Sequence, residues 1–121
     1  MTDQDRSAAP GDRSALEMVC DETFTTRVLH CDVPVLVDYS ATWCAPCRQM
    51  DPVLAELAAQ WAGRVRFVRL DTDANTRTPA EQGVRGIPTL QLFVAGRPVR
   101  RFQGSRTKQE LQDALREVVG H

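Results

Sequence analysis

The chain has 121 residues, of which 42% are hydrophobic, and its formal net charge is −1 at pH 7. This length allows one domain with a core of ordinary size and is too short for two. A charge so close to zero provides no general attraction to nucleic acid or to anionic membranes. No apolar run approaches the roughly 18 residues of a membrane-spanning helix, so a single globular domain is expected.

Residues 1–15 are polar and contain the breaker Pro10-Gly11. We expect them to form a disordered extension, followed by a folded domain at 16–121. The extension lacks the apolar segment of a secretory signal peptide, so we expect a reducing, cytoplasmic location. There, a closely spaced cysteine pair is more often catalytic or metal-binding than structural.

The first elements are a short strand, a helix and a buried strand. The apolar run 16–19 predicts a strand, and Asp21 is placed to cap a helix that ends near Leu29. The next apolar run, 35–39, is nearly continuous, which is typical of a strand buried on both faces. Asp38 interrupts this run.

A long helix is expected next. Apolar residues recur at spacings of three and four from Met50 to Trp61, which predicts a helix that begins at Cys44 and ends at Gly63. A strand is expected to follow at 65–70. The elements expected so far therefore alternate between strands and helices.

The rest of the chain continues this alternation. We expect a short helix at 76–82, a hairpin of strands 89–94 and 99–102, and a last helix opened by the capping box at 107–110. The order predicts an α/β fold with a mixed central sheet of about five strands and four flanking helices.

The segment Cys44-Ala45-Pro46-Cys47 lies between a buried strand and the long helix. Pro46 suits a first helical turn, which places Cys44 at the N-cap, where free N–H groups and the helix dipole favour a thiolate. Cys47 lies on the same side of the helix, within reach of a disulfide. We expect an exposed Cys44 to attack a substrate disulfide and a partly covered Cys47 to resolve the mixed disulfide.

Two other uses of this pair stay open. A zinc site needs about four ligands, and no second C-x-x-C motif supplies the other two. They would have to come from the set Cys20, Cys31, His30 and His121. A structural disulfide is the second alternative. The position between strand and helix favours a redox pair over both, and Cys20 and Cys31 are expected to be small, half-buried residues.

With these residues in place, the chain resembles the thioredoxin family from about Leu16 to Val119. The resemblance is carried by Phe24, Val37-Asp38, Trp43 to Cys47, Pro52, Asp71, Asp73, Gly83 to Thr89, Gly96 and Gly104. It implies the thioredoxin fold and a protein-disulfide reductase, an electron carrier that uses its own cysteine pair and no metal or other cofactor. The implied partners are disulfide-containing proteins and a reductase of the thioredoxin-reductase type as electron donor, with no nucleic acid or membrane partner. A monomer is expected.

The resemblance also implies residue roles. Asp38 matches a buried carboxylate that assists proton transfer at Cys47, and Ile87-Pro88 matches a cis-proline loop whose backbone pairs with an extended substrate. The implied substrate-binding residues are Trp43, Ala45, Pro46, Gly86, Ile87, Pro88 and Gly104. A structural hydrogen-bonded role for Asp38, and ordinary turn or packing roles for the others, stay open.

Three positions near this site, Ala45, Ser40 and Arg69, depart from the family pattern, and Ala45 stands where the commonest motif has glycine. Ser40 stands where an aromatic residue is frequent, which predicts a gap or a water site. Arg69 replaces a frequent lysine; contact with Asp38 would lower the pKa of that carboxyl, but extension to solvent is the favoured interpretation. Asp51 lies one helical turn after Cys47, and we expect its charge to raise the pKa of that thiol modestly.

Two other functions remain compatible with the sequence. One is an oxidase or isomerase of folding proteins, against which the missing signal peptide argues. The other is a non-catalytic thioredoxin-fold binding module or subunit, against which the presence of both cysteines and Pro88 argues.

Overall fold

A computed structural model describes residues 16–120, so the extension expected at 1–15 lies outside the described residues. The elements are β1 (Glu17–Val19), η2 (Thr25–Leu29), β2 (Val35–Ser40), α1 (Ala45–Gln60), β3 (Arg66–Asp71), α2 (Arg77–Glu81), β4 (Thr89–Val94), β5 (Arg97–Gln103) and α3 (Lys108–Val119). Their order is the predicted alternation, and β5 begins two residues earlier than expected. No helix in this part of the chain is both long and apolar enough to cross a membrane.

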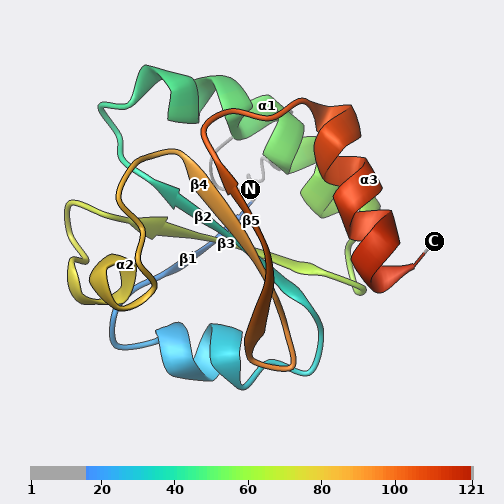
Figure 1. Cartoon of the computed structure of the whole chain (residues 1–121), viewed down its shortest axis with the longest axis horizontal. Coiled ribbons are helices and arrows are strands. Elements are labelled where there is room, and N and C mark those ends of the chain that lie inside the picture. The colour runs from blue at the N-terminus through green and yellow to red at the C-terminus, as the bar shows by residue number, and fades with distance from the viewer. Residues whose placement is uncertain (1–15, 121) are drawn as a thin grey trace, which may run out of the picture.

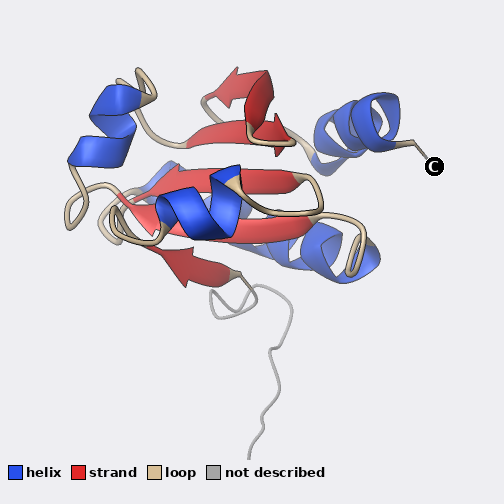
Figure 2. Ribbon diagram, turned by 90° about the horizontal axis from the view of Figure 1, so that it is seen from below, coloured by secondary structure: helices blue, strands red, loops and turns tan. Residues whose placement is uncertain are grey.

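The five strands form one mixed sheet in the order β1-β3-β2-β4-β5 (Figure 1). β1 and β2 both pair with β3 in parallel, whereas β4 pairs antiparallel with β2 and with β5. Helices α1 and α3 lie on one side of the sheet and η2 on the other (Figure 1), and Figure 2, seen from below, shows η2 in front of the strands. The predicted α/β fold with a mixed sheet of five strands is confirmed.

Side chains alternate along the central strand β2, and this alternation sorts the core into two layers. Val37 and Tyr39 pack in the layer that contains Val28 of η2. Leu36 packs in the other layer, with Leu54 of α1 and Leu111 and Leu115 of α3. Because Asp38 alternates with Val37 and Tyr39, it faces α1, the helix that begins at the cysteine pair.

The first helix differs from the expected one. It is a single π-helical turn, Thr25–Leu29, and Asp21 does not cap it. The Asp21 carboxylate instead accepts hydrogen bonds from the backbone N–H groups of Thr78 (2.8 Å) and Arg77 (3.3 Å) at the start of α2. This long-range cap ties the segment before η2 to α2, and local spacing could not reveal it.

We expect Asp21→Ala to lower the melting temperature at pH 7. The hydrogen bonds from Thr78, and then those from Arg77, hold the pKa of Asp21 below its ordinary value of 3.8. A lowered folded-state pKa gives a stabilisation that is present above pH 3.8 and is lost as the pH falls through the folded-state value. The melting temperatures of wild type and variant should therefore converge in acid.

Thermal unfolding followed by circular dichroism between pH 2 and pH 7 measures this convergence. Glu22→Ala, at the exposed neighbouring position, is the matched control and should leave the melting temperature near that of the wild type. A constant difference between Asp21→Ala and wild type across this range would show that the charge of Asp21 has no part in the cap.

Candidate active site

The two cysteines of the motif form a disulfide at the start of α1. Cys44 is the N-cap residue, with extended backbone angles, and its Sγ accepts a hydrogen bond from the backbone N–H of Cys47 at 3.3 Å. The two Cα atoms lie 5.3 Å apart, inside the range that a disulfide requires. The N-cap position places the Cys44 sulfur at the positive end of the helix dipole, which stabilises a thiolate after reduction.

The expected exposure of Cys44 is wrong. Cys44 is 4% exposed and Cys47 is 1% exposed, so both sulfurs are buried in the disulfide form. Ala41 and Ile87 pack against the pair and cover it. The two cysteines still differ, because Cys44 lines an open groove and Cys47 is not among its lining residues.

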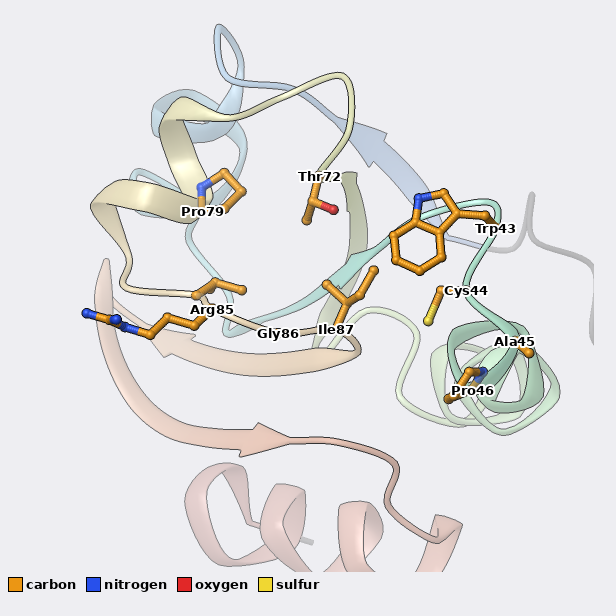
Figure 3. Close-up of a pocket in the computed structure, with 10 residues that line it drawn as sticks. Trp43, Cys44, Ala45, Pro46, Thr72, Pro79, Arg85, Gly86 and Ile87 are labelled. Atoms are coloured by element: carbon orange, nitrogen blue, oxygen red, sulfur yellow. The ribbon is translucent and has the colours of Figure 1, made fainter.

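The groove beside Cys44 has a volume of about 530 Å³. Its walls are Trp43, Cys44, Ala45, Pro46, Thr72, Pro79, Val84, Arg85, Gly86 and Ile87. Figure 3 shows Cys44 at one end, beneath the Trp43 ring and across from Ile87, with Pro79 and Arg85 at the other end. The groove is thus apolar beside the sulfur and carries its one charged lining residue, Arg85, at a distance from it.

Five residues expected to bind substrate line this groove: Trp43, Ala45, Pro46, Gly86 and Ile87. Pro88 and Gly104 do not line it. The Ile87-Pro88 peptide bond is cis, Pro88 is buried, and its carbonyl accepts a hydrogen bond from the Gly104 N–H at 2.8 Å. These two residues therefore shape the loop that presents Ile87.

The far wall of the groove contains four residues that were not predicted to belong to the site: Thr72, Pro79, Val84 and Arg85. Thr72 directly follows β3, and the carboxyl ends of parallel strands are where α/β proteins place their sites, so this signal was present. Pro79 comes from α2, and no sequence signal connects it with the cysteines.

Trp43 is the most exposed large apolar side chain beside the disulfide, at 66%. Its indole Nε1–H donates a hydrogen bond to Asp73 Oδ2 at 2.7 Å. The Asp73 loop is itself ordered, because the Asp73 N–H donates to Asp71 Oδ1 at 2.8 Å. Trp43 is thereby anchored at one edge while its ring forms a wall of the groove.

A buried ion cluster joins β2, β3 and α1, the helix that begins at the cysteine pair. Arg69 Nε lies 2.8 Å from Asp38 Oδ2, and Arg69 Nη2 lies 2.6 Å from Asp51 Oδ1. The Arg69 side chain is 1% exposed, so the expected extension to solvent is wrong. Arg69 is buried because the strand register places it opposite Asp38 of β2. The same guanidinium also donates a hydrogen bond to Asp51 of α1.

Ser40 lies at the edge of a small cavity of about 90 Å³. The cavity is lined by Met18, Ser40, Ala41, Thr42, Arg69 and Asp71. A gap of this size and polarity is large enough to hold water. The gap expected at Ser40 is therefore present, and it reaches Arg69.

Within the described residues, no group of three or more histidine, cysteine, aspartate or glutamate side chains is placed to hold a metal ion. Cys20 and Cys31 are half-buried free thiols in this part of the chain. The redox group is the Cys44–Cys47 disulfide itself.

The protein combines a mixed sheet with a disulfide at the N-terminus of α1, beside an apolar groove. These features define a thiol–disulfide oxidoreductase. The sequence model of the thioredoxin family matches residues 15–117. The chain belongs to the thioredoxin family, whose members act as protein-disulfide reductases.

Individual relatives agree with this assignment. The chain is 43% identical to thioredoxin 1 of Nostoc sp. over 102 residues, which are 84% of this chain and 95% of the relative. It is 41% identical to thioredoxin of Synechocystis sp. over 106 residues, 88% of this chain and 99% of the relative. It is 44% identical to thioredoxin of Mycobacterium bovis over 108 residues, 89% of this chain and 93% of the relative.

Proposed function

We propose that this thiol–disulfide oxidoreductase reduces protein disulfides with Cys44 as the attacking thiol and Cys47 as the resolving thiol. The observation that carries this assignment is the placement of Cys44 as both the N-cap of α1 and a wall of the groove. Cys47 lies behind it, 1% exposed. A protein substrate that occupies the groove would therefore meet Cys44 and not Cys47.

The reaction consists of two exchanges. The Cys44 thiolate attacks one sulfur of the substrate disulfide, which forms a mixed disulfide and releases the other substrate sulfur as a thiolate. The Cys47 thiolate then attacks the Cys44 sulfur, so the Cys44–Cys47 disulfide forms and the second substrate sulfur leaves. The substrate gains two electrons and two protons, and the protein dithiol loses them.

Asp38 is proposed to accept the proton of the Cys47 thiol in the second exchange. It is 2% exposed, and it faces the helix that begins with the cysteine pair. Ala41, which directly follows β2, packs in one buried cluster with both cysteines. Arg69 Nε donates a hydrogen bond of 2.8 Å to this buried carboxylate and holds it in place.

The substrate is proposed to lie extended in the groove. Trp43, Ala45, Pro46, Gly86 and Ile87 would contact the apolar residues around its disulfide. The backbone at Ile87, presented by cis-Pro88, would pair with the substrate in the manner of an added strand. Arg85 at the far end favours substrates with an acidic residue at that distance.

The proposed electron donor is a reductase of the thioredoxin-reductase type, and the proposed location is a reducing compartment such as the cytoplasm, with the protein acting as a monomer. Two free thiols, Cys20 and Cys31, suit a reducing compartment. Family membership supports the donor and the class of disulfide-containing protein substrates.

The direction of electron flow is tested by the reduction potential of the cysteine pair. We expect equilibration with glutathione to give a value near the reducing end of the range, about −270 mV, as is typical of thioredoxins. Cys31→Ser should give the same potential as the wild type. A value near the oxidising end, about −120 mV, would contradict the reductase assignment and favour an oxidase of folding proteins.

A further inference from the structure

The ion cluster Asp38–Arg69–Asp51 contains one cation and two acids, and it draws them from three elements. Asp38 lies on β2, Arg69 on β3 and Asp51 on α1. The side chains are 2%, 1% and 6% exposed, respectively. Hydrogen bonds of 2.8 Å and 2.6 Å join the guanidinium to Asp38 and to Asp51. Water screens this cluster far less than it would screen a surface pair.

One guanidinium cannot neutralise two carboxylates. With both acids ionised, the cluster carries a formal charge of −1, and the two acids share the attraction of Arg69. The planar fork of arginine suits such sharing, because its N–H groups point in fixed directions toward different partners. The electrostatic attraction between Arg69 and the Asp38 carboxylate is therefore weaker than it would be if Asp51 were uncharged.

We propose that Asp51 is a positioning residue of the dithiol site, which holds one arm of Arg69 and draws part of its charge away from Asp38. In this way Asp51 keeps Asp38 able to take up a proton at a higher pH than a simple Asp38–Arg69 pair would allow. The consequence for catalysis rests on the proposed function, in which Asp38 accepts the proton of Cys47.

The titratable side chains near Arg69 come from β2, α1 and β3, and β1 supplies the apolar Met18 opposite Arg69. β2 supplies Asp38, α1 supplies Asp51, and β3 supplies Asp71 at the cavity that Arg69 also lines. Asp71 is half-buried and accepts hydrogen bonds in the loop that follows β3. Asp51 shares the Arg69 guanidinium with Asp38 in the buried cluster.

The test follows the Asp38 carboxyl carbon by NMR as a function of pH in the reduced protein. We expect Asp51→Asn to lower the pH midpoint of Asp38 by about one pH unit relative to wild type, because it removes a nearby like charge. Asp51→Ala should shift it in the same direction, and Asp51→Glu, which retains the charge, should stay closer to the wild type. An unchanged or raised midpoint in the first two variants, even with a lower melting temperature, would overturn the proposal.

Glu56→Gln is the matched control, because it removes one negative charge from the exposed side of the same helix. It should leave the Asp38 midpoint in place, since exposed charges are screened. The NMR signal of the Arg69 Nε proton shows whether Asp51 acts on Asp38 through Arg69. This signal should move downfield in Asp51→Asn, because the hydrogen bond from Arg69 Nε to Asp38 strengthens. A shifted midpoint with an unmoved Nε proton would contradict action through Arg69.

The pH profile of mixed-disulfide resolution separates this inference from the proposed function. In Asp51→Asn, the pH of half-maximal resolution rate should fall together with the Asp38 midpoint. If the Asp38 midpoint falls and the resolution profile stays in place, the proposed catalytic role of Asp38 fails while the inference about Asp51 stands.

Discussion

Replacing Cys44 with serine is expected to lower the rate of protein-disulfide reduction to the background of the chemical reductant alone. A serine hydroxyl is not a thiolate and cannot enter thiol–disulfide exchange. We do not expect Cys47 to replace it, because Cys47 is 1% exposed and does not line the groove in which the substrate is proposed to lie. The precipitation of reduced insulin in the presence of dithiothreitol measures the rate.

Cys31→Ser is the matched control for this experiment, since it removes a half-buried thiol outside the motif. It should reduce insulin at the wild-type rate. Equal rates for Cys44→Ser and wild type would show that the cysteine pair is not catalytic and would favour a binding module built on the same fold.

Replacing Arg69 with methionine is expected to lower the free energy of unfolding by about 3–5 kcal/mol at neutral pH. The substitution leaves the carboxylates of Asp38 and Asp51 buried without the guanidinium that both contact. Removing one partner of a buried ion pair costs this much, because the remaining charge stays desolvated. Urea denaturation of the two proteins measures the difference.

The loss of unfolding free energy should depend on the pH and on how deeply the replaced arginine is buried. Protonation relieves the uncompensated carboxylates, so the deficit of Arg69→Met should be smaller near pH 4 than near pH 8. Arg66→Met, on the same strand, is the matched control: Arg66 is partly exposed and lies 3.8 Å from Glu17, so its loss should cost less than about 1 kcal/mol. Equal losses for the two variants would contradict a buried role for Arg69.

The order of the elements could be predicted from the sequence because it depends on local pattern. The apolar run at 35–39 became the central strand β2, and the capping box at Thr107 and Glu110 opens α3 with both of its hydrogen bonds. Asp21 caps α2 and not the expected helix that follows it in the sequence. Its residue type was correct for a cap, but α2, which it caps, lies more than fifty residues further along the chain.

In the site as well, features set by neighbouring residues could be predicted, whereas features set by distant residues could not. The N-cap position of Cys44 and the reach of Cys47 follow from the spacing of four consecutive residues, and both are confirmed. The burial of Cys44 depends on Ile87, which comes from a distant loop. The burial of Arg69 depends on Asp51, which a strand-by-strand interpretation does not bring to β3.

The difference between the two cysteines is tested most directly by trapping the mixed disulfide. Cys47→Ser and Cys44→Ser, each reduced and then mixed with an oxidised protein substrate, are analysed by mass spectrometry without reductant. Cys47→Ser should accumulate a covalent adduct whose disulfide maps to Cys44, and Cys44→Ser should form none. An adduct on Cys47 in Cys44→Ser, at a yield equal to that of the Cys44 adduct, would contradict the assignment of attacking and resolving thiols.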